Sequence, residues 1–201
     1  MSYHNHLQIK SLPDQFEHTA LDFRARSIRL VQLHRERSGH ELLECTIRAA
    51  STDSHYVCLS YVWGEPGQGR AILLNGHRYW VRQNLWNFLH AARQNTEVRR
   101  RWIWIDALCI DQNNVAERQH QVQQMGLIYS NAAEVYTWLG NDDLISRFLA
   151  MGKGYDSVRY NRSSEPVLSI AGENVLALCS SPYWRRAWTT QEFALARQVT
   201  L

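Results

Sequence analysis

The sequence predicts an α/β domain with a mostly parallel central sheet and helices on both faces. Three apolar runs, at residues 56–63, 102–112 and 134–140, suit the strands of such a sheet. The first run is almost uninterrupted and ends in a loop rich in Gly and Pro, as expected for a strand buried on both faces. Helix-like patterns separate the runs, and this alternation of strand and helix favours parallel pairing.

Two pairs of short strands are predicted as β-hairpins. The first pair follows the N-terminal segment, and we expect it at an edge of the sheet. The second pair flanks Asn75-Gly76, a dipeptide that readily adopts the positive φ angles of a type I′ turn. We expect this second hairpin to be an insertion after the first buried strand. The four strands are residues 27–33, 42–49, 71–74 and 77–81.

Capping residues predict where the helices begin. Asn84 is expected to cap a helix of about ten residues. Asn114 and Glu117 form a capping box for a second helix, which runs to about Tyr129. The remaining predicted elements are helices at 144–151, capped by Asn141 and Asp142, and at 174–179, and a strand beginning at 199.

Length indicates one domain. A chain of 201 residues can build one α/β domain with a real core and is too short for two of ordinary size. The polar residues 1–22 are expected to form a flexible leader and residues 23–201 the domain. The strand pattern at the last residues suggests the N-terminal part of a longer protein.

Composition argues against several classes of function. The net charge of +3 is modest and its basic clusters are short, which is weak support for a nucleic-acid partner. The four cysteines lie far apart and suit reduced thiols of an intracellular protein. The histidines lack metal-ligand spacing, so no metal is expected. No run is long enough to span a membrane, and the expected location is cytoplasmic.

The C-terminal stretch 181–196 places one carboxylate, Glu192, near the start of a predicted helix. Thr189-x-x-Glu192 is a capping box, and Trp188 with Phe193 has the spacing of a hydrophobic staple. Capping alone therefore accounts for these residues. A second interpretation is catalytic, because the helix dipole keeps such a carboxylate ionised. Capping does not explain the neighbouring Arg186. Glu192 can both cap the helix and act in catalysis.

Other polar residues have the same two interpretations. Asp106 and Asp111 lie at or just past the end of a buried run, where open α/β sheets bind ligands. A turn or helix cap is the favoured role for Asp111 but not for Asp106. Ser60 and Tyr61 are more often strand packing than ligands. The basic run at 99–101 suits a solvated helix end.

Three segments carry a family resemblance. They are Leu59-Ser60-Tyr61-Val62-Trp63-Gly64, Trp104-Ile105-Asp106-Ala107-Leu108-Cys109-Ile110-Asp111-Gln112 and Trp184-Arg185-Arg186-Ala187-Trp188-Thr189-Thr190-Gln191-Glu192. In this order they closely resemble the three conserved blocks of the fungal heterokaryon-incompatibility (HET) domain. That family is associated with programmed cell death after non-self recognition, which is the function that the resemblance implies.

The HET domain is in turn distantly similar to the TIR domains of immunity. A TIR domain begins with an apolar strand ending in Ser-Tyr and later has Ser-x-Tyr, a Trp and, four residues on, a Glu. This chain has Ser60-Tyr61, Ser181-Pro182-Tyr183, Trp188 and Glu192 in the corresponding places. The similarity implies a TIR-like or flavodoxin-like fold.

In catalytic TIR domains that Glu is essential for cleaving the nicotinamide-ribose bond of NAD, so the resemblance implies Glu192 as catalytic residue. A carboxylate stabilises the oxocarbenium-like state of such a cleavage, aromatic rings stack on bases, and arginines pair with phosphates. NAD is then a substrate and no cofactor is expected. The expected substrate-binding residues are Ser60, Tyr61, Trp63, Gly64, Asp106, Arg185, Arg186 and Trp188.

Two functions therefore remain open. The first is a cell-death effector that hydrolyses NAD or a related nucleotide and is activated by self-association as a homo-oligomer, with a possible upstream receptor or partner protein. The alternative is a non-enzymatic signalling module that triggers cell death through its protein partners.

Overall fold

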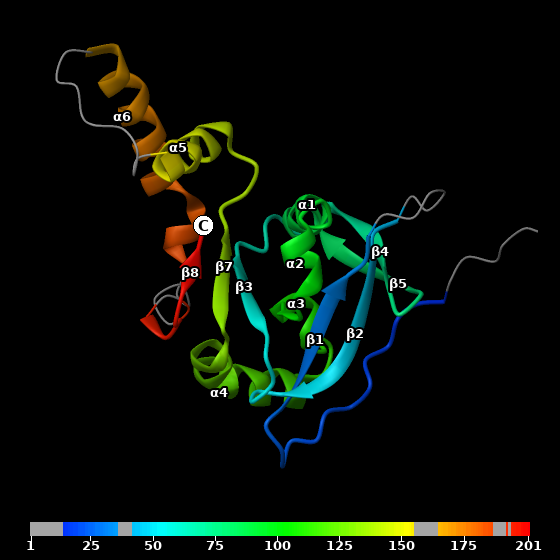
Figure 1. Cartoon of the computed structure of the whole chain (residues 1–201). Coiled ribbons are helices and arrows are strands. Elements are labelled where there is room, and N and C mark those ends of the chain that lie inside the picture. The colour runs from blue at the N-terminus through cyan, green and yellow to red at the C-terminus, as the bar shows by residue number, and fades with distance from the viewer. Residues whose placement is uncertain (1–13, 36–41, 155–164, 187–191, 193) are drawn as a thin grey trace, which may run out of the picture.

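The computed structural model describes residues 14–35, 42–154, 165–186, 192 and 194–201. Within them, the chain forms one mixed sheet of eight strands in the order β5-β4-β2-β1-β6-β3-β7-β8 (Figure 1). The strands are β1 Ser27–Leu33, β2 Glu44–Ser51, β3 Val57–Tyr61, β4 Gly69–Leu74, β5 His77–Arg82, β6 Ile103–Trp104, β7 Glu134–Trp138 and β8 Val199–Thr200. This is the predicted α/β fold.

Parallel pairing predominates around β3. It lies between β6 and β7 and is parallel to both, and β7 is parallel to β8. The β2–β4 pair is also parallel, whereas the β1–β2, β1–β6 and β4–β5 pairs are antiparallel. Every residue of β3 is buried, as its apolar run predicts.

The helices are distributed along the whole chain. They are α1 Gln83–Ala92, α2 Thr96–Arg100, α3 Asp106–Cys109, α4 Val115–Asn131, α5 Asp143–Gly154 and α6 Glu165–Ser180, followed by a 3₁₀ helix at Pro182–Arg185. Figure 1 shows α5 and α6 packed against each other and projecting beyond the sheet.

Helices cover both faces of the sheet, as predicted. On one face, Trp138 of β7 packs against Phe88 of α1 and donates a hydrogen bond to Asn84 of the same helix. On the other face, Trp104 of β6 packs edge to face against Tyr129 of α4. Trp104 pairs with Cys58 of β3, and Trp138 pairs with Tyr61. Because these two β3 residues are three positions apart, Trp104 and Trp138 point to opposite faces of the sheet.

The predicted edge position of the N-terminal hairpin is wrong. The β1–β2 hairpin forms, but it lies inside the sheet because β4 adds to β2 and β6 adds to β1. The second hairpin, β4–β5, instead forms the edge. Its turn has φ 50° at Asn75 and 82° at Gly76, in agreement with the sequence prediction.

Three predicted details of the helices and strands need correction. Asn84 does not cap α1, which begins one residue earlier; its side chain instead donates to Val62 O. The second buried strand is short, because the chain turns into α3 at Asp106. The short helix predicted at 174–179 is the last part of α6, which begins at Glu165.

Other local predictions are confirmed. Asn114 caps α4 by accepting a hydrogen bond from the Glu117 amide at 3.1 Å. Asp142 accepts hydrogen bonds from the first amides of α5. The last residues form β8 against β7. Of the four cysteines, Cys45, Cys58 and Cys109 are buried and Cys179 is exposed, and all are free.

Part of the expected leader lies against the domain. Phe16 pairs through its backbone with Arg78 of β5, and its ring packs edge to face against Tyr79. The His18 ring hydrogen-bonds Leu108 O at 2.8 Å. Residues 14–22 thus follow the surface of β5 and α3, while residues 1–13 lie outside the described part of the chain.

Candidate functional site

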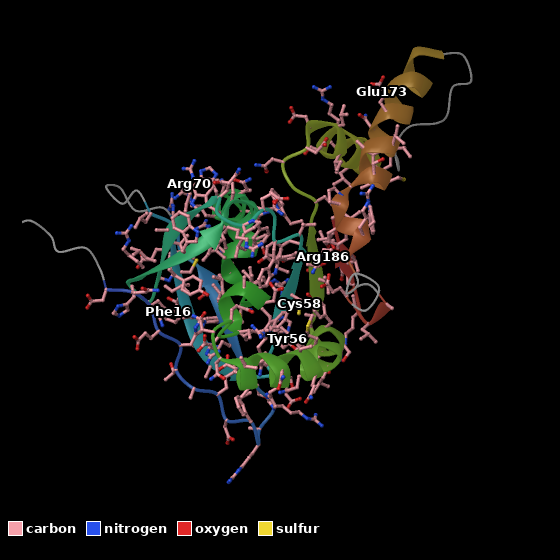
Figure 2. All side chains as sticks on the ribbon, turned by 180° about the vertical axis from the view of Figure 1, so that it is seen from behind. Phe16, Tyr56, Cys58, Arg70, Glu173 and Arg186 are labelled. Atoms are coloured by element: carbon pink, nitrogen blue, oxygen red, sulfur yellow. The ribbon has the colours of Figure 1, made fainter. Side chains whose placement is uncertain are left out.

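Glu192 is the centre of a buried polar cluster. Its side chain is 1% exposed and forms a two-pronged ion pair with Arg186, with N–O distances of 2.9 and 3.0 Å. The Ser60 hydroxyl donates to the same carboxylate, and the Tyr183 hydroxyl hydrogen-bonds Ser60 in turn. The cluster thus joins β3 to the C-terminal segment. In Figure 2, Arg186 lies on that segment, well away from Phe16 and Glu173.

Strand alternation explains why Ser60 points toward Glu192. Cys58 and Ser60 lie on the same face of β3, and Cys58 contacts Ile128 of α4 on that face. Ser60 is fully buried, so its hydroxyl needs a partner, which Glu192 supplies. Tyr183 is also fully buried, in the 3₁₀ helix that Ser181 caps.

A cavity of about 470 Å³ lies beside this cluster, on the other side of Arg186. The predicted residues Trp63, Gly64, Asp106 and Arg186 all line it. Its other described lining residues are Val62, Glu65, Ile110, Gln112, Arg118, Val122 and Met125. The cavity therefore combines an indole ring, two guanidinium groups and carboxyl groups at the end of β3 and β6.

The remaining predicted residues lie elsewhere. Ser60 and Glu192 are behind Arg186 and are not among the described residues that line the cavity. Tyr61 lines a smaller neighbouring cavity. Arg185 is exposed and lines neither cavity. Trp188 and Thr189, and with them the predicted capping box and staple, fall outside the described residues.

Asp106 is the carboxyl group held most firmly at the cavity wall. Its Oδ2 accepts a hydrogen bond from Trp63 Nε1 at 2.7 Å, and its Oδ1 accepts one from the Ala107 amide at 2.7 Å. Burial raises the pKa of Asp106 to about 6, although these hydrogen bonds and the charge of Arg186 lower it. Asp106 therefore titrates near neutral pH, in the range useful to an acid or base catalyst.

The raised pKa predicts a pH-dependent stability. The folded protein binds the Asp106 proton more tightly than the unfolded chain, so the contribution of Asp106 to stability is lost as pH rises from about 3.8 to about 6. Asp106→Asn should abolish this loss, which we expect to be on the order of 1–3 kcal/mol. Denaturant titrations between these pH values measure it. An equally steep fall in the variant would contradict the assignment, and Asp111→Asn serves as the control.

Asp111 has the structural role favoured by its sequence context. Its Oδ1 accepts a hydrogen bond from the Asn113 amide at 3.1 Å, in the turn that precedes α4. The basic run is also structural: Arg99 and Arg100 lie in the last turn of α2, and Arg100 pairs at the surface with Glu97.

Sequence reasoning missed several residues of the cavity, Gln112 and Arg118 among them, and Tyr183 of the cluster. Gln112 donates to Asp106 O at 3.0 Å, and Arg118 donates to Gln112 O at 3.1 Å. Gln112 is the last residue of the second segment that resembles a conserved HET block, so the resemblance could have predicted it as a site residue. Tyr183 is part of the quoted Ser-Pro-Tyr motif, but no sequence pattern shows that it contacts Ser60 across 123 positions.

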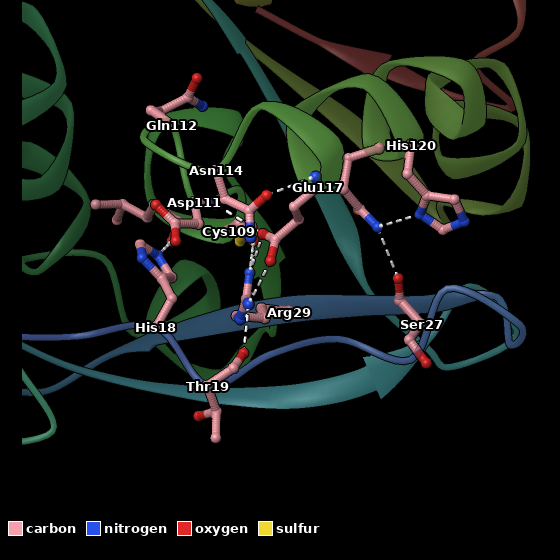
Figure 3. Close-up of polar contacts among 12 residues, drawn as sticks. His18, Thr19, Ser27, Arg29, Cys109, Asp111, Gln112, Asn114, Glu117 and His120 are labelled. Carbon is pink, nitrogen blue, oxygen red and sulfur yellow. Dashed lines mark hydrogen bonds and ion pairs between the residues drawn. The ribbon is translucent and has the colours of Figure 1, made fainter.

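A second buried network joins β1 to the start of α4 (Figure 3). Arg29 of β1 forms a buried ion pair with Glu117 of α4, with hydrogen bonds of 2.6 and 2.9 Å. Arg29 also donates to Cys109 O and Thr19 O. Glu117 accepts from the Asp111 amide instead of closing the predicted capping box. This network fixes the start of α4, from which Arg118 reaches the cavity.

Among the described residues, no group of three or more His, Cys, Asp or Glu side chains could hold a metal ion. None of their helices combines the length and apolar character needed to cross a membrane.

Comparison with known proteins identifies the family. The family model described as heterokaryon incompatibility protein (HET) matches residues 56–192, which contain β3, the cavity and Glu192. The chain belongs to the HET family. Heterokaryon incompatibility protein 6, OR allele, of Neurospora crassa is 32% identical over 138 residues, covering 62% of this chain. The match spans only 20% of that relative. No solved structure matches the chain.

Within the HET match, the three conserved-block segments come together in space. The first supplies Ser60, Trp63 and Gly64, the second Asp106 and Gln112, and the third Arg186 and Glu192. One polar cluster and one cavity therefore contain polar residues from all three blocks, whereas Tyr61, Asp111 and Arg185 lie outside them.

Proposed function

We propose that this chain is a cell-death effector domain of fungal non-self recognition, acting as a glycohydrolase of NAD or a related nucleotide. Membership of the HET family and the relative named heterokaryon incompatibility protein 6 support the first part. The spacing of Ser60-Tyr61, Ser181-Pro182-Tyr183 and Glu192, which resembles that of catalytic TIR domains, supports the second.

One observation carries the enzymatic proposal. The cavity places Trp63, Asp106 and Arg186 together at the carboxyl ends of β3 and β6, where parallel sheets commonly bind nucleotides. An indole stacks on a base, a guanidinium pairs with a diphosphate and a carboxylate holds ribose hydroxyls. Its volume of about 470 Å³ is within the range of small-molecule sites.

The proposed reaction breaks the bond between ribose C1′ and the nicotinamide nitrogen. The bonding electron pair leaves with nicotinamide, and water adds to the oxocarbenium-like carbon and loses a proton. The negative charge of a carboxylate stabilises that carbon. Asp106 faces the cavity and, with its pKa near 6, can accept the proton of water.

Glu192 is the second carboxylate of this mechanism. In the described structure it is covered by Arg186, whose guanidinium contacts both Glu192 and the cavity. A diphosphate in the cavity competes for Arg186. When Arg186 turns toward the diphosphate, the charge of Glu192 is less neutralised and acts on the ribose. Self-association, with or without an upstream partner protein, is the proposed signal that favours this state in the cytoplasm.

The test is nicotinamide release from NAD by purified protein, in dilute solution and after assembly by crowding. We expect release by the assembled wild type and a loss of about 10²–10³-fold in Arg186→Ala, because a charge that stabilises the reacting nucleotide is removed. Arg185→Ala is the matched control, since this neighbouring arginine is exposed and lines neither cavity. Absence of release in every state would refute the enzymatic proposal.

A second candidate function is a non-enzymatic interaction module. It is favoured by exposed apolar side chains on the projecting C-terminal part, where Val175 is 40% and Leu176 66% exposed. Such side chains are typical of protein contact surfaces. If Leu176→Asp abolished cell death while nicotinamide release was absent from the wild type, this alternative would replace the enzymatic one.

A further inference from the structure

A second cavity, of about 170 Å³, adjoins the first. It shares Trp63 and Gln112 with the larger cavity, so the two are separated by little more than the Trp63 side chain. Four of its described lining residues are aromatic, and four of the lining residues belong to β5. The described residues that line it are Tyr61, Trp63, Tyr79, Trp80, Val81, Arg82, Leu85, Ala107 and Gln112.

The rings of this cavity are held in place by polar contacts. The Tyr79 hydroxyl donates to Ala107 O at 3.0 Å, which fixes β5 against α3. Arg82 lies over the Trp63 ring at 5.2 Å and donates to Gly64 O at 2.8 Å. Trp63 is itself fixed by its hydrogen bond to Asp106. The cavity therefore has rigid walls before any ligand binds.

Trp80 is the unusual member of this group. Its side chain is 60% exposed although it is the largest apolar side chain of β5. A Cβ at Gly69, on the paired strand, would lie 2.1 Å from Val81 O and 3.0 Å from Trp80 Nε1, so this glycine is required chiefly by the close approach of the β5 backbone. An exposed indole beside a cavity with several aromatic residues suits a stacking surface better than a packing residue.

The two cavities differ in chemistry in a way that matches a two-part ligand. The larger contains Arg118, Arg186 and Asp106, which suit a diphosphate and a ribose. The smaller contains four aromatic side chains, which suit a flat base. A mononucleotide fills only one of them, whereas a dinucleotide reaches both.

We propose that this smaller cavity, lined by β5, binds the adenine ring of a dinucleotide whose diphosphate and second ribose occupy the larger cavity. This inference rests on the proposed nucleotide specificity and narrows it to adenine dinucleotides. Trp80 contacts the adenine, and Trp63 lies between the two halves. The inserted hairpin thereby becomes a substrate-recognition element.

Calorimetric binding of ADP-ribose and of nicotinamide mononucleotide tests this assignment. ADP-ribose carries the adenine and is not consumed by the proposed reaction, whereas the mononucleotide lacks the adenine. Trp80→Ala should weaken ADP-ribose binding roughly 5- to 150-fold, the usual effect of losing one base-stacking ring. It should leave the mononucleotide affinity unchanged, and Trp80→Phe should restore most of the ADP-ribose affinity.

The control is Phe23→Ala, which removes another exposed aromatic side chain, 43% exposed and stacked on His120 away from both cavities. Unchanged ADP-ribose affinity in Trp80→Ala, equal weakening of both ligands, or no ADP-ribose binding by the wild type would each overturn the inference. This test can fail or succeed independently of the proposed hydrolysis. If ADP-ribose binding depends on Trp80 but no nicotinamide is released, hydrolysis is refuted and the adenine site is not.

Discussion

Replacing Glu117 by alanine is expected to lower the free energy of unfolding by about 3–5 kcal/mol. The substitution leaves the guanidinium of Arg29, which is 3% exposed, without its carboxylate. A buried charge without a partner is far more costly than the ion pair that it replaces. Since domains of this size are stable by only about 5–15 kcal/mol, the variant should unfold at much lower denaturant concentration.

Two further variants separate the ion pair from other effects. Glu97→Ala removes the surface pair with Arg100, whose side chains are about three-quarters exposed, and should change stability by less than about 1 kcal/mol. Combining Glu117→Ala with Arg29→Met should recover much of the loss, because no charge remains buried. The prediction fails if Glu117→Ala and Glu97→Ala have equal effects.

The same ion pair should make stability depend on pH. Burial alone would raise the pKa of Glu117, but hydrogen bonds from Arg29 and the Asp111 amide, with the Arg29 charge, lower it below 4.5. Because the pKa is lower in the folded state, the stabilisation is complete above about 4.5 and is lost as pH falls through the folded pKa. This acid-side loss should be absent from Glu117→Ala.

Features set by neighbouring residues were predictable from the sequence. The turn at Asn75-Gly76 and the cap at Asn114 depend on a few adjacent residues, and both are as predicted. The position of each hairpin in the sheet depends on distant pairings, such as Val31 with Ile103. Short-range patterns contain no information on such pairings, which is why the edge was assigned to the wrong hairpin.

Part of the candidate site was predictable, because the resemblance of three segments to conserved HET blocks pointed to several of its residues. It identified Trp63, Asp106, Arg186 and Glu192, but not that Arg186 would separate Glu192 from the cavity. Ion pairs between distant residues, such as Arg29 and Glu117, have no sequence signature. In the sequence, Arg29 stands near two other basic residues, Arg24 and Arg26, and nothing there indicates a buried carboxylate partner.

Glu192→Gln is expected to reduce nicotinamide release by assembled protein about 10²–10³-fold. Glutamine keeps the size of the side chain and can still accept the hydrogen bond from Ser60, but it lacks the negative charge. That charge holds Arg186 in the free protein and, in the proposed mechanism, acts on the reacting ribose. Turnover of NAD by matched wild-type and variant assemblies measures the loss.

Glu97→Gln is the matched control, because Glu97 is an exposed carboxylate of α2 that lines neither cavity. Its turnover should remain close to that of the wild type. Equal turnover by Glu192→Gln would refute the catalytic role of Glu192. A purely structural role is distinguished by binding: a residue that only supports the fold would lower ADP-ribose affinity, melting temperature and turnover together. A residue that stabilises the transition state lowers kcat without lowering ADP-ribose affinity. In Glu192→Gln this affinity should even rise, because the side chain competes less with the diphosphate for Arg186.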